Sequence, residues 1–174
     1  MKSIEFIEIK PTSHTNVVSN FLIPYPIENH EISRIYLQFM TSALKTAPSE
    51  PGAYINYLPF FVITKIEVDL KMYIRSLSHL DLFYVRDQPH RNEIKQLFWE
   101  YLSLQERRIK AESVYIIYQE LPIDLSNCIL NACHVVDNIP ITIYWRPINE
   151  LVDEQGTLPA LITTPSLFFQ DITY

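Results

Sequence analysis

The residues with the clearest potential for chemistry lie in one short charged run, EVDLK at positions 67–71, which contains Glu67, Asp69 and Lys71. Metal-dependent nucleases place an acid and a lysine two positions apart on a strand, so that both meet a divalent cation and the scissile phosphate. Asp81 would supply a second carboxylate from an adjoining strand. The same pattern also arises on the solvent face of any amphipathic strand. We therefore prefer a solvated face, with a metal-dependent nuclease or other hydrolase as the alternative function.

A second polar group consists of two acids, Glu120 and Asp124, followed by a stripe of Asn127, Asn131 and His134. If a parallel strand ended at Glu120, these side chains would gather where α/β sheets bind ligands, and a carboxylate beside a histidine can perform acid–base chemistry. Asp124 is equally explained as a helix N-cap, and the stripe as a solvent face. We assign no catalytic residue here.

Several classes of site are excluded by residue counts. The chain has two glycines, Gly52 and Gly156, so neither a P-loop, a G-x-G-x-x-G loop nor a G-x-S-x-G nucleophile elbow exists. The five histidines are scattered without metal-ligand spacing. Cys128 and Cys133 would lie about 140° apart on a helix, which suits neither a metal pair nor a disulfide. We expect no cofactor, no metal and no classical nucleotide site.

The overall composition predicts a folded protein with an acidic surface. Hydrophobic residues make up 48% of the 174 residues, charged residues 20%, and the net charge is −6. The closest approach to a basic patch, Arg107, Arg108 and Lys110, is flanked by Glu106 and Glu112. We therefore expect no nucleic-acid binding, because phosphate contacts require clustered cations. No apolar run is long enough to span a membrane, which favours a cytoplasmic location, the host cytoplasm if the gene is viral.

The stretch from Leu58 to Asp87 is predicted to organise the fold. Even positions from Leu58 to Ile74 are apolar, apart from Thr64, while odd positions from Lys65 are mostly charged, which is the period of a half-buried strand. A strand of this length implies a bend or a bulge. The alternative is a helix with Ile63, Ile66 and Leu70 on one side. A second strand is expected at residues 80–85.

The remaining elements alternate between strands and helices. Strands are predicted at residues 3–10, 16–23, 112–121 and 139–146. In the first of these, Ile4 and Phe6 fall on one face and Ile7 and Ile9 on the other, which indicates a bulge or burial on both sides. Repeats of three and four predict helices from Asn29 to Leu44, from Asp87 to Ile109 and from Asp124 to Val136.

This order predicts an α+β fold, a mixed β-sheet with about three amphipathic helices packed on it. A two-layer sandwich is favoured, and a doubly wound α/β sheet is the second choice. Residues 112–146 have the size of a βαβ unit. The chain 1–174 is expected to be a single domain, with the proline-divided residues 147–174 docked on it as an arm or, alternatively, exchanged between subunits.

We predict a noncatalytic protein-binding or assembly module: an adaptor, an inhibitor or immunity-type protein, or a small viral structural or accessory protein. The expected partner is another protein or a second copy. This prediction rests on the excess of aromatic residues, which make up 13% of the chain. It also rests on the apolar residues that begin the central stretch, from 58 to 63, and on the proline-divided residues 147–174. The candidate binding residues are Tyr54, Tyr57, Phe61, Ile63, Phe168 and Phe169.

Overall fold

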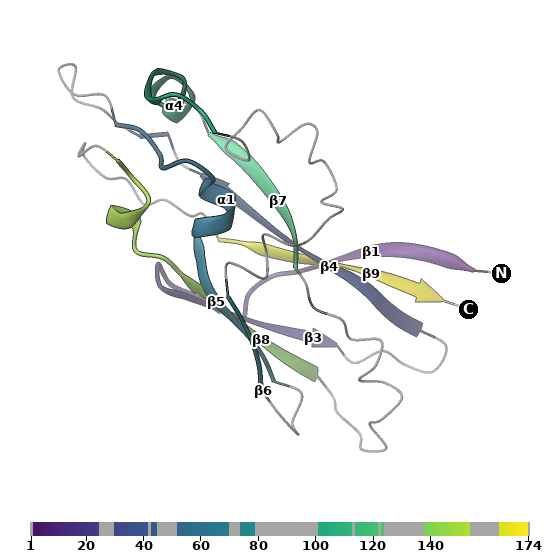
Figure 1. Cartoon of the computed structure of the whole chain (residues 1–174). Helices are drawn as coiled ribbons and strands as arrows, with labels where there is room; N and C mark the ends of the chain where they lie inside the picture. The colour runs from purple at the N-terminus through teal and green to yellow at the C-terminus, as the bar shows by residue number, and fades with distance from the viewer. Residues whose placement is uncertain are drawn as a thin grey trace.

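The structure is a sandwich of two antiparallel β-sheets. The computed structural model describes residues 2–24, 30–41, 43–44, 52–69, 74–78, 101–112, 114–121, 123, 138–153 and 164–173. In this part of the chain the first sheet has the order β1-β9-β4-β7 and the second the order β2-β3-β8-β5-β6 (Figure 1).

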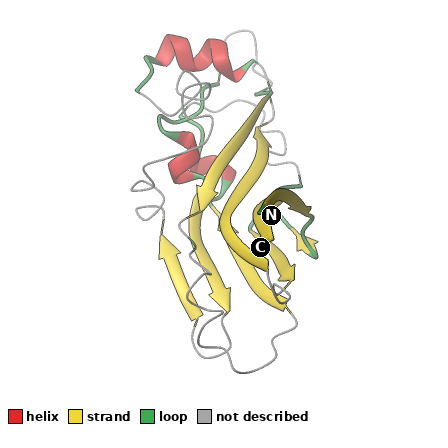
Figure 2. Cartoon of the chain, turned by 90° about the vertical axis from the view of Figure 1, so that its right-hand side faces the viewer, coloured by secondary structure: helices red, strands yellow, loops and turns green. Residues whose placement is uncertain are grey.

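The elements have the following bounds. The first sheet consists of β1 (Ser3–Ile9), β9 (Ser166–Thr173), β4 (His30–Thr41) and β7 (Tyr115–Leu121). The second consists of β2 (Ser13–His14), β3 (Val18–Pro24), β8 (Asn138–Trp145), β5 (Ile63–Asp69) and β6 (Ile74–Ser78). The helical elements are α1 (Leu58–Phe61), α4 (Leu104–Ala111) and a 3-10 turn (Ile148–Glu150). Figure 2 shows the helices gathered at one end of an elongated sandwich.

The connectivity is that of a jelly roll. Without the two-residue β2, the described part of the chain has eight strands. If these are renumbered from 1 to 8 along the chain, the first sheet has the order 1-8-3-6 and the second the order 2-7-4-5. The first and last strands pair with each other, Ser3 opposite Thr173, and successive strands lie in different sheets except for the β5–β6 pair. Two such interlocked Greek keys define the jelly roll, a fold of viral capsid domains, lectins and cupins.

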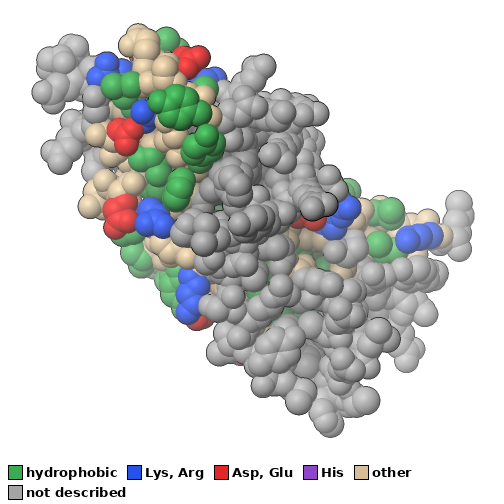
Figure 3. Space-filling view, viewed as in Figure 1, with side chains coloured by type: hydrophobic (Ala, Val, Ile, Leu, Met, Phe, Trp, Pro, Cys, Tyr) green, Lys and Arg blue, Asp and Glu red, His purple; other side chains and the backbone are tan. Residues whose placement is uncertain are grey.

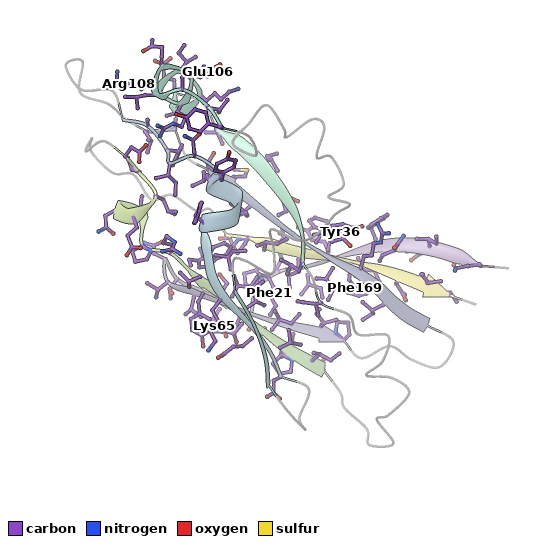
Figure 4. All side chains as sticks on the ribbon, viewed as in Figure 1. Phe21, Tyr36, Lys65, Glu106, Arg108 and Phe169 are labelled. Atoms are coloured by element: carbon purple, nitrogen blue, oxygen red, sulfur yellow. The ribbon has the colours of Figure 1, made fainter. Side chains whose placement is uncertain are left out.

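The hydrophobic core lies between the two sheets. β8 shows the expected alternation, with Ile139, Ile141, Ile143 and Trp145 buried and the residues between them more exposed. Across the sandwich, the Phe39 ring of β4 contacts the Trp145 ring edge-on, with centroids 5.8 Å apart. Phe21 and Phe169 also lie between the sheets (Figure 4). The strands are therefore amphipathic toward one common interior.

The predicted α+β class is wrong, and β4 shows why. The expected helix from Asn29 to Leu44 is an extended strand over His30–Thr41. A β-bulge places Ser33 as an extra residue between the pairs Ile32–Asp171 and Arg34–Gln170. Because of the bulge, Ile32 and Ile35 both face the core although they are three positions apart. A bulged strand thus reproduces the apolar spacing of a helix.

The central stretch is shorter and more broken than predicted. Residues 58–61 form helix α1, and only Ile63–Asp69 form strand β5. A second bulge, at Thr64, lets Ile63 and Ile66 both face the core. The predicted alternation is confirmed beyond it, since Ile66 and Val68 are buried and Lys65 and Asp69 exposed. The strand expected at residues 80–85 lies outside the described residues, and β5 pairs instead with β6.

The βαβ prediction is also wrong, because β7 and β8 belong to different sheets. The helix expected between them, residues 124–136, lies outside the described residues. Of the helix predicted from Asp87 to Ile109, the described part is α4, which begins with a capping box between Ser103 and Glu106. The C-terminal segment supplies β9, which lies between β1 and β4 inside the first sheet.

Candidate functional site

The charged run of β5 lies on the outer face of the second sheet. Glu67 forms an ion pair with Lys65, and the Tyr144 hydroxyl donates to Glu67 Oε2 at 2.9 Å. Bonds from Lys65 and Tyr144 hold the pKa of Glu67 below its usual value, and the bond to Glu67 raises the pKa of Tyr144. Lys65 lies 5.5 Å from the Tyr144 ring centroid, on the side of its sheet away from the core (Figure 4). Glu67 is therefore engaged in a local surface network.

The structure describes one of the other three residues of the proposed nuclease site. Asp69 is exposed at the end of β5, whereas Lys71 and Asp81 lie outside the described residues. In the part of the chain that the structure describes, no cluster of three His, Cys, Asp or Glu side chains is arranged to hold a metal ion. Of the second polar group, Glu120 ends β7 in the first sheet, and Asp124 and His134 are not among the described residues.

A serine–histidine pair that the sequence did not indicate lies at the start of the second sheet. Ser19 Oγ is 2.7 Å from His14 Nδ1 and accepts a hydrogen bond from Trp145 Nε1, also at 2.7 Å. A nucleophile beside a base is one arrangement for covalent catalysis. However, Ser19 is completely buried, so a substrate cannot reach its hydroxyl. The pair instead fixes β2, β3 and β8 to one another.

A buried arginine holds together three connections at the helical end. Arg107 of α4 donates to the Tyr54 carbonyl at 2.7 Å and forms an ion pair with Asp153. Tyr54 also forms a β-bridge with Val152. These residues come from the β4–β5, β6–β7 and β8–β9 connections, far apart in the sequence. The guanidinium of Arg107 is thus engaged in contacts within the fold. It differs in this from a surface arginine that could bind phosphate.

The six residues predicted to bind a partner fall into three groups. Tyr54, Ile63 and Phe169 are buried, with exposed fractions of 0%, 0% and 3%. Tyr57 and Phe61 are partly buried against the same core. Phe168 is partly exposed and points to the outer face of the first sheet, since it is opposite Tyr36 and Glu8. The structure does not bring the six together into one surface.

The outer face of the first sheet carries apolar side chains beside polar ones, which include Glu8, Arg34, Gln38, Glu120 and Gln170. Facing residues of antiparallel neighbours point to the same side. Several apolar side chains therefore share this face across the four strands: Ile4, Phe6, Tyr36, Met40, Ile116, Phe168 and Ile172. Phe6 is 61% exposed, Ile4 52% and Ile116 46%. The Phe6 ring lies 6.1 Å from that of Tyr36, whose label marks this side of β4 in Figure 4.

The outer face of the second sheet has a different character. Thr142 Oγ1 donates to Asn20 Oδ1 at 3.0 Å, and Asn20 Nδ2 donates to Ser13 Oγ at 2.8 Å. Together with the Lys65, Glu67 and Tyr144 network, these bonds give that sheet a polar surface. The outer face of the second sheet thus exposes Leu22 beside this polar network, whereas that of the first sheet exposes Ile4, Phe6 and Ile116. Exposed apolar side chains that gather on one face are typical of an interaction surface.

The helical end also reaches the surface with apolar side chains, but among charges. Tyr101 is 73% exposed and Ile109 59%, and both are close in sequence to Arg108 and Lys110. Figure 3 shows apolar side chains (green) interspersed with basic and acidic ones over this end of the molecule. Scattered apolar residues of this kind are normal on a soluble surface. The outer face of the first sheet is therefore the stronger candidate site.

The slip in the pattern of β1 is explained without a bulge. The pairing with β9 runs unbroken from Ser3–Thr173 to Ile9–Leu167. Ile7 and Ile9 pack against the core, whereas Ile4 and Phe6 point to the outer face. Alternation is thus regular, with Ile7 and Ile9 toward the core and Ile4 and Phe6 on the exposed outer face. The sequence shows that both faces of β1 carry apolar residues. Which of these residues face the core became clear only from the pairing of β1 with β9.

Comparison with known proteins supports the fold. No protein-family model matches this chain, and no curated protein matches its sequence. A chain in the 3.5 Å resolution cryo-EM structure of the Sputnik virophage has a similar fold, with a TM-score of 0.57 and 8% sequence identity. The match covers 98% of this chain and 48% of that one, so this chain spans about half the length of its structural neighbour. Within the described residues, no helix has the length and apolar character required to cross a membrane.

Proposed function

We propose that this chain is a noncatalytic structural module of a virus particle, which assembles with other copies of itself. The observation that carries the proposal is the jelly-roll connectivity of this chain. A fold similarity to a chain of the Sputnik virophage structure, which covers 98% of this chain, supports it. Jelly rolls occur in viral capsid domains, as well as in lectins and cupins. Because a fold alone does not determine function, the surfaces must support the assembly.

The outer face of the first sheet supports assembly. Both outer faces of a free-standing sandwich are expected to be polar, as the second sheet is. The first sheet leaves Phe6, Ile4 and Ile116 about half exposed on one face. Covering such side chains contributes roughly 25 cal/mol for each Å² of apolar surface removed from water. A protein partner over this face therefore accounts for its composition.

The test is the assembly state of the purified full chain. Size-exclusion chromatography with light scattering should give masses above 20.5 kDa that increase with concentration, and electron microscopy should show regular assemblies. Each copy has a net charge of −6, so added salt should promote association by screening repulsion. A monomer at all concentrations and salt levels would contradict the proposal.

A further inference from the structure

The free edge of β1 and the apolar face beside it form one continuous surface. We propose that a second copy of this chain binds there, with β1 pairing antiparallel to β1 of the other copy about a twofold axis at Phe6. This inference names the contact behind the proposed self-assembly and rests on that proposal.

The first argument is that β1 is an open edge. Among the described strands, β1 pairs with β9 alone and ends the order β1-β9-β4-β7. An edge strand presents peptide N–H and C=O groups on which another strand can pair. Natural edges are commonly protected by proline, by lysine or by a bulge. The segment SIEFIEI has neither proline nor lysine, its register with β9 is unbroken, and its charged side chains are Glu5 and Glu8.

The second argument is exposure. Residues 3–6 of β1 are exposed, including Ile4 at 52% and Phe6 at 61%. β1 and β9 run side by side to the end of the molecule where both chain ends lie (Figures 1 and 2). Ile4 and Phe6 point to the same outer face as Tyr36 and Phe168. A strand added beside β1 would therefore extend the apolar face as well as satisfy the edge.

The third argument is self-complementarity, which any twofold contact requires. A twofold antiparallel pair places residues of the same face opposite one another. With the axis at Phe6, that ring meets Phe6 of the second copy, Ile4 meets Glu8, and Glu5 meets Ile7. Within β1 no carboxylate is opposite another carboxylate, and the like-charged pair of this register, Lys2 and Lys10, lies beyond the two ends of the strand. The pattern of charges along β1 thus suits a copy of itself.

Other twofold registers are less favourable. An axis at Glu5 would place two Glu5 carboxylates directly opposite each other, and like charges at facing positions destabilise a strand pair. An axis at Ile7 leaves the N-terminal residues of β1 without a facing residue. The register at Phe6 aligns all seven residues of the strand and joins two four-stranded sheets into one continuous sheet.

The test is a symmetric disulfide. Phe6→Cys is introduced into the full chain carrying Cys128→Ser and Cys133→Ser, and the protein is oxidised mildly. Facing Cβ atoms of antiparallel strands are about 4.5–5.5 Å apart, close to the range of a disulfide. We expect a shift from monomer to covalent dimer on non-reducing electrophoresis. The matched control, Ile4→Cys in the same background, should remain monomeric, because Ile4 is opposite Glu8 and not opposite itself.

A second pair of variants tests the same contact without a disulfide, in case the cysteine variants fail to fold. Phe6→Glu places like charges at the axis and should shift the light-scattering mass toward the monomer. Leu22→Glu, at a site 41% exposed in β3 on the outer face of the other sheet, should leave the mass unchanged. Circular dichroism establishes that each variant is folded.

The outcomes separate the two proposals. Equal cross-linking of both cysteine variants, or oligomers that persist in Phe6→Glu, would overturn the β1 contact while leaving self-assembly intact. A parent protein that is monomeric at every concentration would overturn both. Selective cross-linking through Phe6→Cys supports the contact and its register.

Discussion

Single residues matter most in this fold where they connect segments that the sequence separates widely. Ser19 joins the indole of Trp145 to the ring of His14, and Arg107 joins three inter-strand connections. Neither serine nor arginine forms a sequence motif at these positions. Their roles arise because the jelly-roll path returns to the same end of the sandwich several times, so the partners could not be identified from spacing along the chain.

At this scale we predict that Arg107→Met destabilises the protein by about 1.5–3 kcal/mol, the usual contribution of a hydrogen bond to a charged group. Methionine retains the apolar stem but leaves the Tyr54 carbonyl without the Arg107 donor and Asp153 without its counter-ion. Because the Asp153 side chain is 41% exposed, water offsets part of the loss. Denaturant unfolding measures the change.

The control is Arg34→Met. The side chain of Arg34 is 50% exposed, and its ion pair with Glu120 is long, at 3.9 Å. Its loss should change the free energy of unfolding by well under about 1 kcal/mol, as for other surface pairs. Equal effects of the two substitutions would show that Arg107 is not a structural tie.

At the scale of elements, the bulge in β4 explains why a helix was predicted for residues 29–44. In β4 the extra residue Ser33 and in β5 the extra residue Thr64 shift the phase of the apolar side chains by one position. A shift of this kind turns a spacing of two into a spacing of three, which a sequence reader assigns to a helix. Strand β8, which has no bulge, was placed correctly by its alternation.

This explanation predicts that deletion of Ser33 is tolerated. Removal of the extra residue leaves Ile32 opposite Asp171 and Arg34 opposite Gln170, so every buried side chain keeps its direction. Thermal unfolding followed by circular dichroism should show a folded protein with a modest loss of stability.

Deletion of Gln38 provides the matched control, because the register there is unbroken. Deletion of Gln38 shifts one part of β4 by one residue relative to its neighbours. The side chains of that part then point to the opposite face of the sheet, so buried residues such as Ile35 and Leu37 turn outward. Each such exposure costs about 1.5–3 kcal/mol, enough in sum to unfold a domain of ordinary stability. If both deletions unfold the protein alike, Ser33 is not a dispensable bulge residue.

At the scale of the whole molecule, the two sheets stabilise each other. Phe39 comes from the first sheet and Trp145 from the second, and their rings meet in the core. Both strands are central in their sheets rather than at an edge. The sandwich should therefore unfold as one cooperative unit.

Accordingly, Phe39→Ala is expected to destabilise the protein by about 3–5 kcal/mol, the range for deletion of a buried aromatic ring. Near-ultraviolet and far-ultraviolet circular dichroism should lose signal at the same denaturant concentration. Phe6→Ala, at a 61% exposed site, should cost much less. Two separate transitions in Phe39→Ala would contradict the cooperative sandwich.

The sequence by itself determined the local character of many segments. Apolar patterning placed β1, β3, β7 and β8 within a few residues, although only β8 showed a clean alternation, and the two glycines excluded loops that wrap phosphate. It also identified the outward direction of Lys65 and Asp69. These properties depend only on neighbours along the chain, so one sequence suffices to predict them.

The tertiary structure decided the class of fold and the candidate site. Whether Ile4 and Phe6 face a core or the outside depends on the pairing of β1 with β9, whose facing residues are separated by nearly the whole chain. Whether Ile32 and Ile35 belong to a helix or to a bulged strand depends on β9 in the same way. Strand pairing is a contact between distant segments, and the hydrophobic pattern of one segment does not name its partner.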